Sequence, residues 1–273
     1  MQTVAVAWQV YEITRNPASL GLIGVANFLP ILLFSLVGGL AADKLDRKKL
    51  LILSQSSMAI LAFILFMLTL FHLINPWIIY FVLVLNSTAQ SFSLPARQAV
   101  LPHLVPKPYF MNAVSLHTLQ WQSAAMIGSA IAGILIATSG VSSVYLFNAL
   151  SFLVFIITVF KITIPLHSKR QEVPFSLESI LEGIRFVFKT PILNTIMILD
   201  FLATFFGTAT ILMPVFAKDV LHVGPQGLGL LYSAPAIGGV LAGILLSSLQ
   251  KQENQGKVII GSIILYGFAT IGF

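Results

Sequence analysis

The chain has 273 residues, of which 9% are charged and 57% are hydrophobic. A soluble globular domain carries about 25% charged residues, so this composition excludes a soluble enzyme or binding module. The apolar residues form long unbroken runs, whereas the strands of an outer-membrane barrel alternate apolar and polar side chains. Cysteine is absent, which excludes disulfides and cysteine-ligated zinc. The net charge of +6 is not taken as a sign of nucleic-acid binding, because in a membrane protein the location of the charges matters more than their sum.

The positions of the charged residues divide the chain into membrane spans. Residues 50–96 and 108–160 contain no Asp, Glu, Lys or Arg, whereas one crossing takes only about 20 helical residues. Each stretch must therefore hold two spans and a turn, and Asn75-Pro76 and Ser139-Gly140 supply turn signals near the two midpoints. The same reasoning predicts full spans near residues 18–42, 50–72, 77–95, 109–138, 142–161, 191–217 and 227–250, and partial spans at 1–13 and 258–273.

Lysines and arginines indicate which side of the membrane each loop faces. Thirteen of the 15 lie in alternate loops, and only Arg15 and Lys218 lie in the loops between them. By the positive-inside rule, the loops rich in Lys and Arg are cytoplasmic. The two partial spans favour a piece of a longer transporter that begins inside its first helix and stops inside its ninth.

The longest polar stretch, residues 162–190, divides the chain into two parts. We expect residues 1–161 to form a first bundle of six helices and residues 191–273 to begin a second bundle. Within the linker the apolar residues keep helical spacing and most charged residues fall on the other side. This pattern is typical of an amphipathic helix on the membrane surface. A surface helix that joins two halves explains the segment better than a regulatory site does.

A weak internal repeat supports two related halves. An offset of about 205 residues places Val10-Tyr11 on Val215-Phe216 and Pro30 on Pro235. Six predicted spans separate the two copies, so both copies run in the same direction across the membrane. Parallel halves of this kind are one known plan for secondary transporters.

The loop after the first full span carries a motif with a known counterpart. Gly39, Asp43, Arg47 and Lys48 match the pattern G-x-x-x-D-x-x-x-R-[RK] on the predicted cytoplasmic side. A basic turn that only sets topology would explain the charges, but not Gly39 and Asp43 together. The motif resembles the signature between the second and third helices of the major facilitator superfamily. Further segments resemble its siderophore-exporter and macrolide-efflux-like branch, namely residues 8–12, 94–102, 182–186 and 212–217.

The resemblance implies an all-α membrane protein with the major facilitator fold, built from two pseudo-symmetric six-helix halves. It also implies a secondary transporter of the bacterial cytoplasmic membrane that exports small amphipathic molecules, such as siderophores or drugs, in exchange for protons. In that family the motif is a cytoplasmic gate, and the partner helix of Asp43 is the eleventh, which lies outside this chain. Two residues depart from family patterns. Ser129 stands where antiporters often carry proline, and Arg97 lies at the end of the fourth predicted span, not inside it.

Motifs for enzymatic chemistry are missing from the sequence. We find no HExxH, GxSxG or Walker A pattern, so we predict neither an enzyme nor ATP-driven export, and no cofactor or metal. The expected partners are a small-molecule substrate, protons and the lipid bilayer, with no nucleic acid. Two alternatives stay open: an uptake permease of the same fold, and a receptor or scaffold that does not transport.

Polar residues inside the spans are the candidates for the transport site. Asp200 is the only acidic residue well inside a predicted span, where a charged Asp costs about 2.5–3.5 kcal/mol. Asp200, with His117 as a second candidate, is expected to couple transport to protons, and a hydrogen-bonded structural Asp is an equal alternative. His117 shares a helix face with Gln120 and Trp121, which line a cavity or hydrogen-bond to another helix. The predicted cavity residues are Gln9, Asn27, Gln120, Trp121 and Gln122.

Overall fold

The computed structural model describes residues 1–161, 185–207, 209–248 and 255–272, and every secondary-structure element described there is a helix. The all-α fold class is thereby confirmed. The chain divides into two compact units. The first comprises the described residues of Met1–Ser168 and Ile211–Gly243, and the second those of Lys169–Thr210 and Ile244–Phe273. Most of the predicted amphipathic linker helix lies outside the described residues, and the division at residues 161 and 191 stays a prediction.

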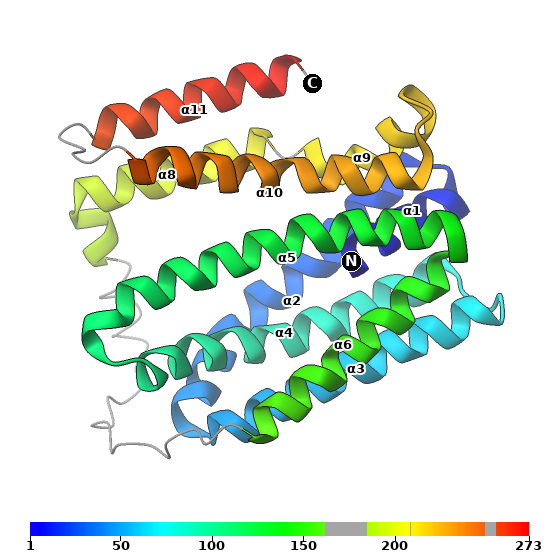
Figure 1. Ribbon diagram of the computed structural model, residues 1–273, viewed down its shortest axis with the longest axis horizontal. Helices are drawn as coiled ribbons and strands as arrows, with labels where there is room; N and C mark the ends of the chain where they lie inside the picture. Colours follow the sequence, from blue (N-terminus) through cyan, green and yellow to red (C-terminus); the bar gives the residue numbers. More distant parts are fainter. Residues whose placement is uncertain (162–184, 208, 249–254, 273) are drawn as a thin grey trace. The chain divides into compact units, whose positions relative to one another are not determined.

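The first unit contains most of the predicted spans (Figure 1). Its main helices are α1 (Gln2–Thr14), α2 (Pro17–Lys44), α3 (Arg47–Leu70), α4 (Pro76–Leu104), α5 (Phe110–Ser139), α6 (Val141–Lys161) and the start of α10 (Gly224–Ser248). Shorter helices are η1 (Lys107–Tyr109), α9 (Met213–Val215) and η3 (Phe216–Val220). Among the described residues, the five helices from α2 to α6 are long and apolar enough to cross a membrane. Within this unit α2 packs on α4, α4 on α3, and α3 on α6.

The second unit contains α8 (Pro191–Gly207) and α11 (Gln255–Gly272), which pack against each other. Between α8 and α9 the chain forms the short helix η2 (Ala209–Leu212). The predicted span 191–217 is therefore not one continuous helix. Pro214 has no N–H with which to continue an α-helical hydrogen-bond ladder, and Gly207 is a poor helix former, so the sequence itself favours a break in this stretch.

The turns between helices lie where local sequence signals predict them. Asn75 caps α4, because its side-chain oxygen accepts a hydrogen bond from the Ile78 N–H at 2.9 Å. Pro76 occupies the first helical position, where its missing N–H removes no hydrogen bond. Gly140 separates α5 from α6 with a φ of 80°, a conformation that glycine adopts without strain. Both predicted turns are confirmed.

The fourth span continues to Leu104, beyond its predicted end at residue 95. Pro95 has no N–H to donate to the Ser91 carbonyl four residues earlier. In the structure this carbonyl lies against Gly38 of α2, so close that a β-carbon on Gly38 would clash with it. α4 continues through Pro95 as α2 and α10 continue through Pro30 and Pro235, and such proline residues are tolerated in membrane helices.

The core of the first unit surrounds α1, whose residues from Val4 to Tyr11 are all buried. A helix that is apolar on all sides belongs in the interior of a bundle. A further close crossing joins α5 to α10. A β-carbon on Gly133 would lie 2.6 Å from the Pro225 carbonyl, and one on Gly229 would lie 2.6 Å from the Ser129 carbonyl. Small residues therefore let these two helices touch along their backbones.

Candidate functional site: polar contacts at the two ends of the helix bundle

The predicted cytoplasmic gate motif lies at the turn between α2 and α3. Asp46 caps α3, with its side-chain oxygen accepting a hydrogen bond from the Lys48 N–H at 2.9 Å. The Arg47 guanidinium donates to the carbonyl of Ala42, near the end of α2, at 3.3 Å and to the carbonyl of Ala99, in α4, at 2.9 Å. Carbonyls in the last turn of a helix lack intrahelical partners and attract cations. Arg47 therefore ties the end of α2 to α4.

The other motif residues differ in what surrounds them. The Lys48 ammonium donates to the Phe160 carbonyl at 2.9 Å and so ties α3 to the end of α6. A β-carbon on Gly39 would meet no atom within 4 Å, so the closest helix approach in this unit is at Gly38 and not at Gly39. The side chain of Asp43 lies outside the described part of the structure. The motif acts here as a clamp on helix ends, and its role as a gate stays a prediction.

A second group of polar side chains joins α1 to η3 at the opposite end of the bundle. This outer cluster consists of Trp8, Tyr11 and Glu12 on α1 and Lys218 and Asp219 on η3. The Tyr11 hydroxyl donates to the Asp219 carboxylate. The Lys218 ammonium lies 3.9 Å from a Glu12 carboxylate oxygen and 5.3 Å from the centroid of the Trp8 ring. The positive-inside rule predicts that this end is extracellular.

Short irregular helices position the two η3 side chains against α1. η3 is π-helical, a geometry that is rare and often found at functional sites. Met213 and Ala217, on the same segment, are buried in the hydrophobic core that surrounds α1. Burial of these two side chains fixes the segment, and the wider π turn presents Lys218 and Asp219 to the end of α1.

Two of the predicted cavity residues are hydrogen bonded within the bundle. Gln9 is buried, donates to the Thr69 hydroxyl at 3.1 Å and accepts from the Tyr145 hydroxyl at 2.7 Å. It thereby links α1 to α3 and α6. Asn27 accepts a hydrogen bond from the Ser87 hydroxyl at 3.0 Å, which links α2 to α4. Contact of Gln9 or Asn27 with a substrate stays a prediction.

The remaining predicted cavity residues lie on α5. His117, Gln120 and Trp121 are exposed within the first unit, and the Trp121 side chain is 58% exposed. Because α5 is a continuous helix here, the three side chains share one face as the sequence predicts. Gln122 instead reaches α10, since a β-carbon on Gly239 would lie 2.6 Å from its side-chain nitrogen. Contact of these α5 residues with a substrate stays a prediction.

The two proton-coupling candidates belong to different units. Asp200 lies in α8, within the apolar stretch Leu193–Leu202, and its side chain is exposed in the second unit. His117 belongs to the first unit. The coupling roles of Asp200 and of His117 both stay predictions. Among the described residues, no three His, Asp or Glu side chains are placed to hold a metal ion.

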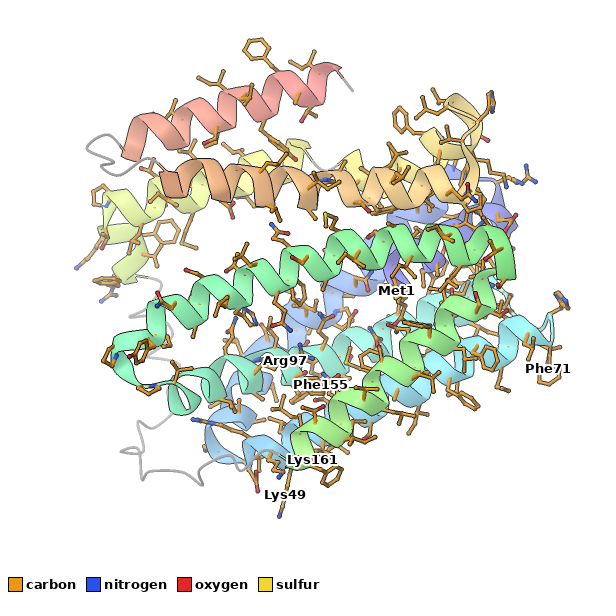
Figure 2. The ribbon with its side chains drawn as sticks, in the orientation of Figure 1. Met1, Lys49, Phe71, Arg97, Phe155 and Lys161 are labelled. Carbon is orange, nitrogen blue, oxygen red and sulfur yellow. The ribbon has the colours of Figure 1, made fainter. Side chains whose placement is uncertain are left out.

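Arg97 lies in α4, which continues past the predicted end of the span at residue 95. It falls within the apolar stretch Pro76–Val100, because α4 continues past Pro95. Its guanidinium carbon lies 4.6 Å from the centroid of the Phe155 ring on α6 (Figure 2). The face of an aromatic ring attracts a cation most strongly where water is scarce. Arg97 thus lies three residues before the end of the apolar stretch, where it packs α4 against α6.

Comparison with known proteins identifies the family. All 273 residues match the family described as transmembrane secretion effector. The chain belongs to this family of major facilitator transporters. It is 29% identical to the staphyloferrin A transporter of Staphylococcus aureus, over 98% of this chain and 68% of the relative. It is 27% identical to the enterobactin exporter EntS of Escherichia coli, over 98% and 64%, and 24% identical to the multidrug efflux pump Tap of Mycolicibacterium fortuitum, over 97% and 67%. The chain thus spans about two thirds of the length of these relatives.

Membership in the secretion effector family confirms the resemblance deduced from the Gly39–Lys48 motif. It establishes a multi-pass transport protein of the bacterial cytoplasmic membrane. Tyr11, Lys218 and Asp219 are site residues that no motif in the sequence singles out. A signal near them is present in the sequence, since the repeat aligns residues 10–11 with 215–216, two positions before Lys218.

Proposed function

We propose that this transmembrane secretion effector exports small amphipathic molecules of the siderophore class by proton-coupled alternating access. The outer cluster is the observation that supports this proposal most directly. Its Tyr11–Asp219 hydrogen bond joins residues 208 positions apart, at the first and seventh spans expected from the sequence. Hydrogen bonds and cation–π contacts contribute about 0.5–3 kcal/mol each, and an exposed ion pair about 0.2–1 kcal/mol. Contacts of that size can break and re-form during a transport cycle.

The cytoplasmic end offers the complementary half of the mechanism. Arg47 and Lys48 hold the ends of α2, α4 and α6 together as one body. Gly39 leaves open space beside that body for the approach of a further helix. In our proposal the outer cluster and this surface close in turn, so the substrate faces one side of the membrane at a time.

The names of the relatives and the exposed face of α5 support the substrate class. Two relatives are named for the siderophores staphyloferrin A and enterobactin, and a third for multidrug efflux. Trp121 supplies an apolar ring beside the polar His117 and Gln120, a combination that accommodates molecules with apolar and polar parts.

Locking the outer cluster tests the proposal. These 273 residues contain no cysteine, so Glu12→Cys with Lys218→Cys adds the only thiols within them. In everted vesicles with an acid interior, we expect the full-length variant to accumulate a siderophore until a reducible bifunctional thiol reagent joins the two residues. Transport should then stop, and a reductant should restore it. Each single-cysteine variant, treated with the same reagent, is the control.

The alternatives give different results in the same assay. Undiminished transport by the cross-linked protein would show that the outer cluster does not open. An uptake permease would move the siderophore out of the everted vesicles, and a receptor would bind it without any flux. Each of these three outcomes contradicts the proposal.

A further inference from the structure

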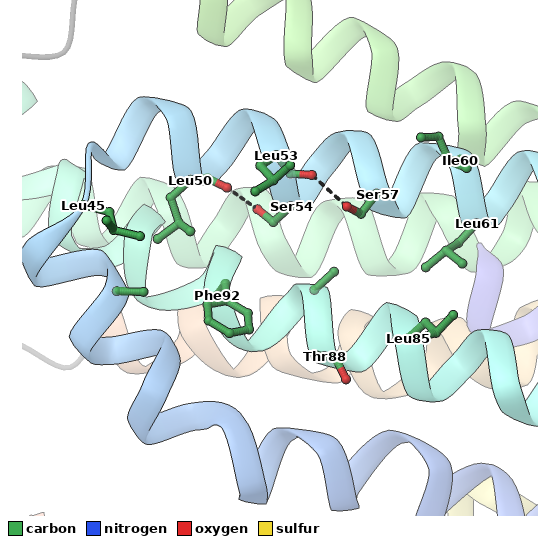
Figure 3. A pocket seen from close by; sticks show the side chains of 12 residues that line it. Leu45, Leu50, Leu53, Ser54, Ser57, Ile60, Leu61, Leu85, Thr88 and Phe92 are labelled. Carbon is green, nitrogen blue, oxygen red and sulfur yellow. Dashed lines mark hydrogen bonds between the residues drawn. The ribbon is translucent and has the colours of Figure 1, made fainter.

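A groove of about 600 Å³ lies between α3 and α4, and Ala41 and Leu45 at the end of α2 complete its lining (Figure 3). This volume falls within the roughly 300–1,000 Å³ typical of ligand sites. The groove involves none of the residues of the outer cluster or the α5 face. Two of its wall residues, Leu53 and Ile60, are 66% and 61% exposed, so the groove is open along one side.

The lining of the groove offers almost no polar group to a ligand. Its three hydroxyls donate to their own helices: Ser54 to the Leu50 carbonyl at 2.8 Å, Ser57 to the Leu53 carbonyl at 3.0 Å, and Thr88 to the Val84 carbonyl at 2.8 Å. Hydroxyls bonded in this way have no proton left to donate to a guest. The groove is therefore suited to a hydrocarbon chain and not to a polar substrate such as a siderophore.

The length and position of the groove match one leaflet of a bilayer. Its α3 wall runs from Leu50, one turn after the start of the helix, to Leu61. At about 1.5 Å per residue this wall spans roughly 16 Å, close to half of the roughly 30 Å hydrocarbon thickness of a bilayer. The start of α3 is on the predicted cytoplasmic side, so the groove spans the cytoplasmic leaflet.

Two lysine residues lie near the cytoplasmic end of the groove, where the headgroup of a membrane lipid would be. Lys49 precedes Leu53 by one helical turn on α3, and Lys44 precedes Leu45 at the end of α2. Both lysine side chains are exposed, and neither ammonium is engaged in a hydrogen bond or ion pair among the described residues. Residues 43–49 carry four cations and two anions, and one of the anions, Asp46, caps α3. Anionic headgroups of the cytoplasmic leaflet are attracted to such juxtamembrane lysines.

We propose that this groove binds one anionic phospholipid of the cytoplasmic leaflet, with an acyl chain between α3 and α4 and its phosphate held by Lys44 and Lys49. The bound lipid fills the groove beside the α2–α3 turn. It adds a lipid contact to the turn that Arg47 already ties to α4. This inference does not depend on the export proposal, because it concerns a lipid that stays in place and not a transported molecule.

Native mass spectrometry of the full chain, released from vesicles of equal phosphatidylglycerol and phosphatidylcholine, tests the site. Each lysine near an anionic surface contributes roughly a 5-fold preference, so Lys44→Gln with Lys49→Gln should reduce retained phosphatidylglycerol roughly 25-fold. Arg185→Gln with Lys189→Gln is the matched control. It removes two charges from an exposed helical segment in the second unit and should retain the lipid.

A second variant tests the groove itself without changing charge. Ala89→Phe places a ring in the groove and should displace phosphatidylglycerol, whereas Ala137→Phe, at an exposed position near the end of α5, should not. Phosphatidylglycerol retention by Ala89→Phe at the wild-type level would overturn the proposal. Equal binding of phosphatidylcholine and phosphatidylglycerol by the wild-type protein would overturn it as well, as would displacement of the lipid by a siderophore added at saturating concentration.

Discussion

Tyr11 and Asp219 stand 208 positions apart in the chain and are joined directly, with the tyrosine hydroxyl donating to the carboxylate. Glu12 and Lys218 pair beside them at 3.9 Å. Tyr11 belongs to the segment that the internal repeat aligns with residues 215–216, a few positions before Asp219. Two equivalent segments of the repeat therefore meet at one end of the bundle, as expected for helices near a pseudo-twofold axis.

Removing this hydrogen bond should open the outer end more often. Tyr11→Phe keeps the ring and loses a bond to a charged acceptor, which contributes about 1.5–3 kcal/mol. If the bond exists only in the closed state, the open population rises roughly 10-fold or more. A cysteine introduced at Val10, which is buried behind the cluster, should then react correspondingly faster with an impermeant maleimide added outside.

Tyr80→Phe is the matched control for that measurement. The Tyr80 hydroxyl donates to the Ser19 carbonyl at 2.9 Å, and both residues lie within the first bundle, on α4 and α2. Its loss removes a similar bond without touching the outer cluster. Equal labelling rates in wild type and Tyr11→Phe, or equal acceleration in both variants, would show that the Tyr11 bond does not hold the end closed.

How far the sequence predicts the fold depends on whether the signal is local. The ends of α5 and α6 agree with prediction within a few residues, because apolar length and the Gly140 turn are local features. The end of α4 does not agree. A proline removes a helical hydrogen bond, yet α4 continues through Pro95 and approaches Gly38 of α2 at the Ser91 carbonyl, a contact between distant segments that no local pattern predicts.

In the candidate site, too, the sequence predicts the residues of a local motif but not their partners on other helices. Arg47 and Lys48 are identified from sequence because the motif lies in one short loop. Their actual partners, carbonyls of α2, α4 and α6, depend on helix packing that no local pattern describes. The pairing of Lys218 with Glu12 likewise follows from the π-helical turn of η3, which a hydrophobicity pattern does not reveal.

Arg47 should not tolerate replacement by lysine. A guanidinium carries several donors in a rigid fork, so Arg47 reaches the Ala42 and Ala99 carbonyls together, whereas a lysine ammonium does not match that geometry. We expect Arg47→Lys to lower the free energy of unfolding in detergent by about 1–3 kcal/mol. Arg15→Lys, an exposed position at the other end of the bundle, should change it by less than about 0.5 kcal/mol. Equal free energies of unfolding for the two variants would show that Arg47 does not act as a clamp between α2 and α4.

Two glycines should respond differently to alanine. In Gly133→Ala the new β-carbon would lie 2.6 Å from the Pro225 carbonyl, so α5 and α10 must separate and stability should fall by about 1–3 kcal/mol. In Gly39→Ala the β-carbon meets nothing within 4 Å, and the helix gains about 0.5–1 kcal/mol from the better helix former. Both values are measured by unfolding in detergent.

The Gly39→Ala variant also separates a structural role of the motif from a gating role. If another helix approaches Gly39 in one state of the cycle, Gly39→Ala should slow transport in everted vesicles while its stability stays at or above the wild-type value. Wild-type transport by a stable Gly39→Ala protein would leave the glycine without a gating role, and only the topological function of the basic turn would remain.

Asp200 should be required for proton coupling. It lies in the apolar part of α8, where an ionised carboxylate costs about 2.5–3.5 kcal/mol, and proton-driven alternating access needs a group that exchanges protons with both sides. Asp200→Asn resembles the protonated form and preserves the hydrogen bonds of a structural Asp. We expect this variant to lose pH-gradient-driven accumulation of siderophore in everted vesicles and to keep exchange of labelled for unlabelled siderophore. Asp46→Asn is the matched control, because asparagine caps a helix as well as aspartate does and Asp46 lies in the turn between two apolar stretches. Concentrative transport by Asp200→Asn at the wild-type pH dependence would exclude Asp200, and His117 would become the next candidate.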